Sequence, residues 1–301
     1  MKRWSKGIFA GLLVVVGMIP MTSCAGSTNP EIEVLASIKP LQLIAQALTD
    51  GVSDSQVLLP PGVTPHDYAL KPSDLKKVYA AGLLLWLGPD FEPYLEKPVR
   101  MHEGVELSVR APNELASHEL HGDHQEHGAH DHLFGDPHIW FSPVEAERIA
   151  VELAAVLMER DPRNADMYQE NLRGFKQRLN DLDQQIRSQL STGVGRYLVA
   201  HDAYSYFEAH YGLSHVAVIS DQPESKPGAK GLLTLLETIK SERVRCLFVE
   251  PQTDLRIVNI LAADNAIKIY RLDPMATDIA LSKKGYEAFL QDTANRFQQC
   301  Q

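Results

Sequence analysis

Histidine is distributed unevenly along the chain: some histidines crowd into one polar segment and others stand singly near apolar runs. These two environments suggest different chemistry. Six of the twelve histidines lie within fifteen residues, in the segment SHELHGDHQEHGAHDH that spans 117–132. A seventh, His138, follows in GDPHIWFSP, between a proline and a β-branched, aromatic pair. Neutral imidazole is a common ligand of zinc and related cations. The sequence therefore raises two hypotheses: one metal site, or two kinds of histidine with separate roles.

Three histidines outside the dense segment share a position relative to predicted elements. His66 lies in the loop after the apolar run 55–59, His201 directly follows the run 196–200, and His138 stands just ahead of a helix start. Open α/β sheets bind ligands beyond the carboxyl ends of their strands. A single histidine in such a place is more often a hydrogen-bonded loop or core residue, but three in equivalent places favour a shared metal site.

Three imidazoles on a tetrahedral cation leave one position for water or a carboxylate. Asp273, at the end of IKIYRLDP, is the preferred candidate for that position, and water is the alternative. Glu250, at the end of another apolar run, is equally suited to cap a turn or to orient a ligand. Metal-bound imidazoles usually donate their second N–H to a carboxylate or carbonyl. Acids adjacent in sequence that could serve are Asp67, Asp136 and Asp202.

The elements that must position these side chains alternate between strand and helix, which is typical of parallel sheets covered by helices. Strands are expected at 33–38, 55–59, 83–88, 196–200, 215–220, 245–250 and 267–273. Helices are expected at 40–50, 73–82, 229–244 and 253–265. The fold class predicted is α/β, with two parallel-sheet lobes at 31–161 and 195–301.

A long helix over 162–191 is predicted between the lobes. Asp161 is the expected N-cap, Pro162 occupies the first helical position, and apolar residues recur in steps of three and four. A helix of about 30 residues extends roughly 45 Å, enough to span two lobes, and a long surface helix of one domain is the alternative. Just upstream, Ser142 and Glu145 form a capping-box pattern that fixes a helix start after HIWF.

The first 24 residues read as a secretory signal: a basic start, an apolar stretch too short to span a bilayer comfortably, and a small-residue cleavage zone. Met21 to Cys24 resembles a lipobox, so Cys24 is a candidate for lipidation; cleavage after Ala25 would instead release a soluble protein. Export removes three basic residues and no acid, which changes the net charge from −10 to −13. An acidic surface argues against nucleic acid as a partner.

Cys246 and Cys300 remain as a pair after Cys24 is set aside. Pairing is the default expectation in an oxidising compartment, and two buried free thiols are the alternative.

Several segments together resemble a known family, the zinc-uptake ABC-transporter solute-binding proteins of the ZnuA type, which are TroA-like. The matching motifs, in the family's order, are TPHDYALKPSD, WLGPDFEPYLEKP, DPHIWFSP, HDAYSYFEAHYGL, EPQ and LDP. The resemblance implies two α/β lobes joined by a long rigid helix, with one zinc ion in the cleft between them. It also implies His66, His138 and His201 as ligands and a pairing of Cys246 with Cys300. Pro65 stands where some zinc-binding members carry an acid that can complete the coordination, so the resemblance does not imply a fourth ligand from this position.

The dense histidine segment is predicted to be a loop, 117–135, because it has few residues that could pack. The resemblance suggests a weak secondary metal site there, and a solvated insertion with adventitious affinity is the alternative. Its six candidate ligands are His118, His121, His124, His127, His130 and His132.

The function expected is extracytoplasmic capture of Zn²⁺ and delivery to a cognate ABC permease and its ATPase, by a monomeric protein that is not an enzyme. Its only membrane contact would be a lipid anchor, and its location periplasmic or otherwise extracytoplasmic. Two alternatives stay open: a zinc-dependent hydrolase, since three imidazoles and water also form a catalytic arrangement, and a metal-binding surface adhesin or store.

Overall fold

The computed structural model describes Met1 and residues 33–66, 68–110, 136–220, 226–263 and 266–301. Apart from Met1, the predicted signal segment 1–24, with Cys24, lies outside the described residues, and so does the predicted loop 117–135. Residues 31–301 form one compact unit. Within the described ranges, no helix combines the length and apolar character needed to cross a membrane.

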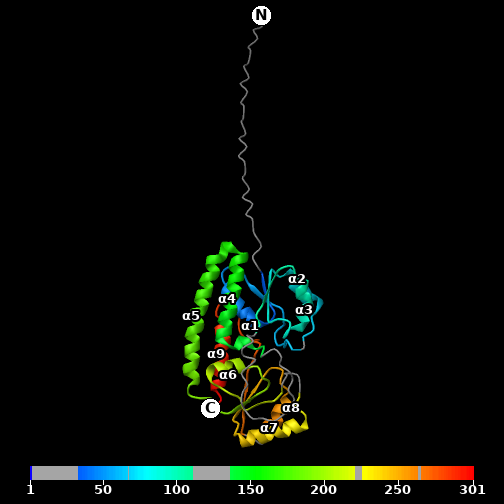
Figure 1. Cartoon of the computed structure of the whole chain (residues 1–301), viewed down its shortest axis with the longest axis vertical. Coiled ribbons are helices and arrows are strands. Elements are labelled where there is room, and N and C mark those ends of the chain that lie inside the picture. The colour runs from blue at the N-terminus through cyan, green and yellow to red at the C-terminus, as the bar shows by residue number, and fades with distance from the viewer. Residues whose placement is uncertain (2–32, 67, 111–135, 221–225, 264–265) are drawn as a thin grey trace. The chain divides into compact units, whose positions relative to one another are not determined.

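Two four-stranded sheets, both entirely parallel, form the centre of the fold (Figure 1). The first has the order β2-β1-β3-β4 and the second the order β6-β5-β7-β8, so the two halves of the chain repeat one topology. The predicted α/β class with two parallel-sheet lobes is confirmed. The strands of the first sheet are β1 (Val34–Ala36), β2 (Ser55–Val57), β3 (Leu83–Trp86) and β4 (Val105–Ser108). Those of the second are β5 (Tyr197–Val199), β6 (Ala217–Val218), β7 (Cys246–Val249) and β8 (Lys268–Arg271).

Helices follow the strands in both halves, as right-handed crossovers between parallel strands require. In the first half they are α1 (Lys39–Thr49), α2 (Pro72–Ala80), α3 (Pro93–Arg100) and α4 (Pro143–Arg160), with the 3-10 turn η2 (Ile139–Phe141) ahead of α4. After the turn η3 (Pro162–Asn164) comes the long helix α5 (Ala165–Leu190). The second half contains α6 (Ser205–Tyr211), α7 (Ala229–Ser241), α8 (Leu255–Ala262) and α9 (Gly285–Gln298).

The inner strands are buried along their whole length, which explains their continuous apolar sequences. Every residue of β1, β3, β5 and β7 is buried, because helices cover both faces of each sheet. The edge strand β4 was not predicted: its sequence VELS is half exposed and carries an acid, so it lacks the apolar run that identified the inner strands.

Helix α5 begins three residues later than predicted, and Asp161 is not its N-cap. The turn η3 separates Asp161 from the helix, so its carboxylate cannot reach the first free N–H groups of α5. It accepts instead from the Asn164 amide and from the Tyr168 hydroxyl. The helix still has 26 residues, which corresponds to about 39 Å.

One face of α5 packs against α1 and α4 of the first half, and against α9 of the second half (Figure 1). The predicted apolar stripe is buried except that Leu172 is only half-buried and Asn171 takes its place. The Asn171 amide donates to the carbonyls of Leu48 and Asp50, and its oxygen accepts from Lys283. A single buried polar side chain thus joins α5 to segments from both halves.

Cys246, at the start of β7, and Cys300, after α9, form a disulfide with a Cα–Cα distance of 5.8 Å. Both residues are fully buried, and the Gly195 amide donates to the Cys300 carbonyl. The bond therefore attaches the end of α9, which packs on α1 and α5, to β7, one of the two inner strands of the second sheet.

Replacing both cysteines by serine should destabilise the fold by about 4 kcal/mol, because the bond closes a separation of 54 residues in the unfolded chain. Urea unfolding of the oxidised protein and the double variant measures this. The wild-type protein under reducing conditions is the control and should match the variant. A loss below about 1 kcal/mol would contradict a role of the bond in stability.

Candidate metal centre

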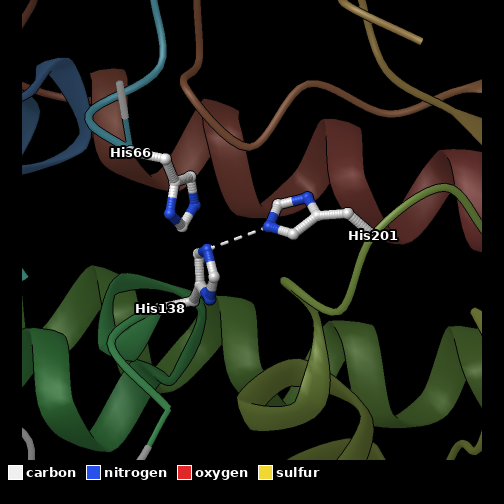
Figure 2. A group of neighbouring side chains, drawn as sticks. All are labelled: His66, His138 and His201. Carbon is white, nitrogen blue, oxygen red and sulfur yellow. Dashed lines mark hydrogen bonds between the residues drawn. The ribbon is translucent and has the colours of Figure 1, made fainter. Parts of the chain in front are cut away.

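Three histidines from separate parts of the chain converge on one point. His66 comes from the loop after β2, His138 directly precedes η2, and His201 follows β5. One ring nitrogen of each lies within 4.8 Å of the other two, and Figure 2 shows the three rings turned toward one another. Within the described residues, this is the group of histidine, cysteine and carboxylate side chains with the geometry to hold a metal ion.

The spacing of the rings is close to that of a bound ion. The Nε2 atoms of His138 and His201 are 3.3 Å apart. Tetrahedral zinc with Zn–N bonds of about 2.0 to 2.1 Å separates its ligand nitrogens by about 3.3 to 3.4 Å. No two of the three ligand nitrogens are more than 4.8 Å apart, so the widest pair exceeds that separation by at most about 1.5 Å. A small movement of one ring therefore completes a three-histidine site.

Asp136 orients His138. Its Oδ1 lies 2.7 Å from His138 Nδ1 and also accepts from the His138 backbone amide, at 2.9 Å. The other carboxylate oxygen accepts from the hydroxyl of Ser205, at the start of α6. Hydrogen bonds from both halves thus hold the carboxylate that holds the ring.

Glu250 has the same role for His201. Its Oε1 lies 2.9 Å from His201 Nδ1 and accepts from the Tyr204 hydroxyl, also at 2.9 Å. The neighbouring acid Asp202 was the partner considered for His201, and the structure assigns that contact to Glu250 instead. The reason is topological: β5 and β7 are adjacent strands, so the residues that follow them lie side by side.

These two contacts determine which nitrogen faces the centre. A neutral imidazole that donates from Nδ1 carries its lone pair on Nε2. His138 and His201 therefore direct two lone pairs at each other across 3.3 Å, the dashed contact in Figure 2. Such a contact is favourable when a cation lies between the nitrogens, either a proton on one ring or a metal ion.

The pKa values of His66, His201 and Asp136 are shifted in different directions, so these three side chains differ in how readily they bind a proton. Burial, reinforced by the other two imidazoles, lowers the pKa of His66 to about 3. Burial also opposes the charged form of His201, but the Glu250 carboxylate outweighs it and raises the pKa above its ordinary value. The pKa of Asp136 stays below its ordinary value despite burial, because His138 and Ser205 stabilise its charge. The site therefore holds the anionic carboxylate of Asp136 behind an imidazole that faces the centre.

Apolar side chains surround the rings and limit solvent access. Trp140 and Met275 line the cavity with the three histidines, and the ring of Phe91 lies 5.1 Å from that of His66, edge to face. His138 and His201 are only 4% and 3% exposed. Low local polarity strengthens every electrostatic interaction in the site. Sequence reasoning missed Phe91, Trp140 and Met275 because isolated apolar residues outside the regular strands and α-helices carry no signal of their own.

Asp273 does not belong to the group, contrary to the expectation that it supplies the fourth ligand. Its two carboxylate oxygens accept from the backbone amides of Met275 and Thr277, at 3.0 and 2.7 Å. The physical reason is local: two residues after β8 the chain turns, and a short acidic side chain there bonds its own backbone.

The remaining histidines divide between described and undescribed parts of the chain. His102 contacts the Ala81 carbonyl, His210 pairs with Asp183, and His215 pairs with Glu208, so these three are engaged away from the centre. The six histidines from His118 to His132, and Asp67, lie outside the described residues.

A family model described as "ZnuA: Zinc-uptake complex component A periplasmic" matches residues 34–300. The chain belongs to the ZnuA family. High-affinity zinc uptake system protein ZnuA of Haemophilus ducreyi is 36% identical, over 97% of this chain and 99% of its own length. The Yersinia pestis protein of the same name is 34% identical, over 99% and 98%.

Solved structures agree with the ZnuA assignment. A crystal structure of ZnuA has a TM-score of 0.73 at 26% identity, covering 89% of this chain and 99% of the other. A ZnuA deletion mutant with zinc bound also has a TM-score of 0.73, at 25% identity, with coverage of 90% and 98%. The ZnuA family is described as a periplasmic component of an uptake complex, so this chain belongs to a family of transport proteins that act outside the cytoplasm.

The proton affinities of the metal-free site can be measured one ring at a time by NMR titration. His66 should stay neutral between about pH 5 and 8, because its pKa is about 3. His201 should titrate above the ordinary histidine range, since Glu250 raises its pKa, and Glu250→Gln should lower that value. A folded state that binds this proton more tightly gains stability below about pH 6.5 and loses it as pH rises through the raised pKa.

Glu208→Gln is the matched control for that titration. It removes a buried carboxylate that raises the pKa of a different histidine, His215, in the same half of the chain. It should move the titration of His215 and leave that of His201 in place. An unchanged His201 in Glu250→Gln would contradict the assigned pairing.

Proposed function

We propose that this protein captures one Zn²⁺ ion outside the cytoplasm and delivers it to the permease of an ABC transporter, whose ATPase drives uptake. The observation that carries the proposal is the convergence of His66, His138 and His201 on one point, with carboxylates that turn two of them inward. The relatives named as high-affinity zinc uptake proteins and the zinc-bound structural neighbour support it.

The donor set favours zinc over harder cations. Three neutral imidazoles suit zinc, whereas manganese and magnesium prefer carboxylate and carbonyl oxygen. The two carboxylates closest to the rings, Asp136 and Glu250, already accept from imidazole, hydroxyl and backbone groups. The fourth tetrahedral position is left to water, consistent with the placement of Asp273 elsewhere.

The pocket that holds the ligands draws on both predicted lobes, 31–161 and 195–301. Thr64, Pro65 and Trp140 line it from one side of the sequence, and Gln252, Pro274 and Met275 from the other. We infer that the lobes, joined by the helix predicted over 162–191, enclose the ion between them. Cys24 would anchor a monomeric chain to the membrane after removal of 1–24, and the histidines of 117–135 would form a weak secondary site.

A zinc hydrolase is the alternative from another class, and the site supports it less well. Hydrolysis needs a general base that can take a proton from metal-bound water. Asp136 and Glu250 each contact the Nδ1 atom of a histidine whose Nε2 atom faces the centre. Both carboxylates are therefore placed to orient ligands rather than to take a proton from metal-bound water. A surface adhesin shares this fold at 22% identity, a likeness that concerns the fold alone.

Calorimetry of chelator-stripped protein should give one tight zinc site per chain. His201→Ala should weaken it by roughly 100-fold or more, since even residues that only support a ligand contribute 10- to 100-fold. Deletion of 117–132 should change the affinity far less, and His215→Ala, which removes another histidine paired with a carboxylate, should leave it unaltered. Equal losses for His201→Ala and the deletion would contradict the division between the two kinds of histidine.

A further inference from the structure

The turn between β8 and α9 contacts the loop that carries His138. In this turn, residues 273–277, the carboxylate of Asp273 accepts from the amides of Met275 and Thr277. The Ala276 amide donates back to the Asp273 carbonyl. Ala276 has a φ of 52°, in the left-handed region that residues other than glycine rarely adopt. The Asp273 hydrogen bonds on either side of it hold the backbone in that conformation.

Two carbonyl groups of the ordered turn accept donors from the first half of the chain. The Pro274 carbonyl accepts from the indole Nε1 of Trp140, at 2.9 Å, and the bond is buried. The Thr277 carbonyl accepts from Lys39 Nζ, at 2.7 Å, at the start of α1. The turn is therefore the acceptor for donors that lie 134 and 238 residues away in sequence.

Trp140 in turn contacts a ligand. Its ring lies 5.1 Å from that of His138, edge to face, and both line the metal cavity. Its backbone carbonyl accepts from the hydroxyl of Tyr286 in α9, at 2.8 Å. A ring held at the indole nitrogen and at the backbone has little freedom, so it restricts the position of His138 as well.

We infer that Asp273 is a positioning residue for metal capture, which acts on His138 through the 273–277 turn and Trp140 rather than by touching the ion. The inference rests on the proposed function and deepens it. Asp273, two residues after β8, thereby has a role at the site although its carboxylate bonds to the backbone of its own turn. The second half thus helps to place a ligand that belongs to the first.

A double-mutant cycle tests the inference. Asp273→Asn keeps the shape but replaces one acceptor oxygen by a donor, and Trp140→Phe keeps a ring but removes the indole N–H. Each should lower zinc affinity about tenfold, the range for residues that support a ligand. Because both substitutions act through one turn, the double variant should also bind zinc only about tenfold more weakly than the wild-type protein. A loss of about a hundredfold would show independent roles and overturn the inference.

Two spectroscopic readouts separate positioning from ligation. The coordination number of the Co²⁺-substituted protein, read from the intensity of its visible absorption, should be the same in wild type and Asp273→Asn, and a changed coordination number would make Asp273 a ligand. In the metal-free protein, the indole N–H signal of Trp140 should move in Asp273→Asn, while that of Trp86, bonded to Glu106, should not. An unmoved Trp140 signal would contradict the path through the turn.

Asp161→Asn is the matched control, since it alters another carboxylate that holds a turn, at the far end of the 18-residue helix α4. It should leave zinc affinity and both indole signals unchanged. If Asp273→Asn does not fold, Lys39→Met loosens the same turn from its other end and should lower affinity about threefold. No change with Lys39→Met would then overturn the inference. Wild-type protein that binds no zinc would refute the proposed function itself.

Discussion

The structure depends above all on two carboxylate–imidazole hydrogen bonds. Asp136 and Glu250 hold the Nδ1 atoms of His138 and His201, and each is itself held by further hydroxyl groups. They fix the tautomers, so that the Nε2 atoms of His138 and His201 face each other at 3.3 Å. This contact is favourable when a proton or a metal ion lies between the two nitrogens. The low pKa of His66 keeps a third lone pair available, so that three imidazoles can bind a metal ion together.

The fold supplies this arrangement from distant parts of one chain. Parallel strands direct their carboxyl ends to one edge, so the loop after β2 and the residues after β5 and β7 present side chains at corresponding places in two sheets. Helix α5 packs along elements of both halves, and Asn171 hydrogen-bonds to both. Helix α9, attached to β7 by the Cys246–Cys300 bond, packs against α1 and donates from Tyr286 to the backbone of Trp140. Rigid contacts thus surround a site made of loops.

The sequence predicted the features that follow from local residue patterns, namely most strands and the three histidines of the site. Of the eight strands in the described residues, seven matched apolar runs. Two of the three histidines that converge were identified by their places after strands, and His138 by its place ahead of a helix start. Contacts that depend on packing between strands were harder to foresee. His201 pairs with Glu250, which follows the adjacent strand, rather than with its neighbour Asp202. The sequence offered Glu250 either as a turn cap or as a residue that orients a ligand, and only the pairing of β5 with β7 decides between these roles. Asp273 was expected at the ion because it ends a strand, but a following turn takes up its carboxylate. Asn171 interrupts an apolar stripe for reasons visible only once Lys283 lies beside it.

Anomalous diffraction from a zinc-loaded crystal, recorded on both sides of the zinc absorption edge, locates the ion and its ligands in one experiment. We expect one strong peak about 2.0 to 2.1 Å from a ring nitrogen of each of His66, His138 and His201, with Asp136 and Glu250 still on the opposite nitrogens. A principal peak bound elsewhere, or rings that face away from a common point in the loaded protein, would contradict this expectation.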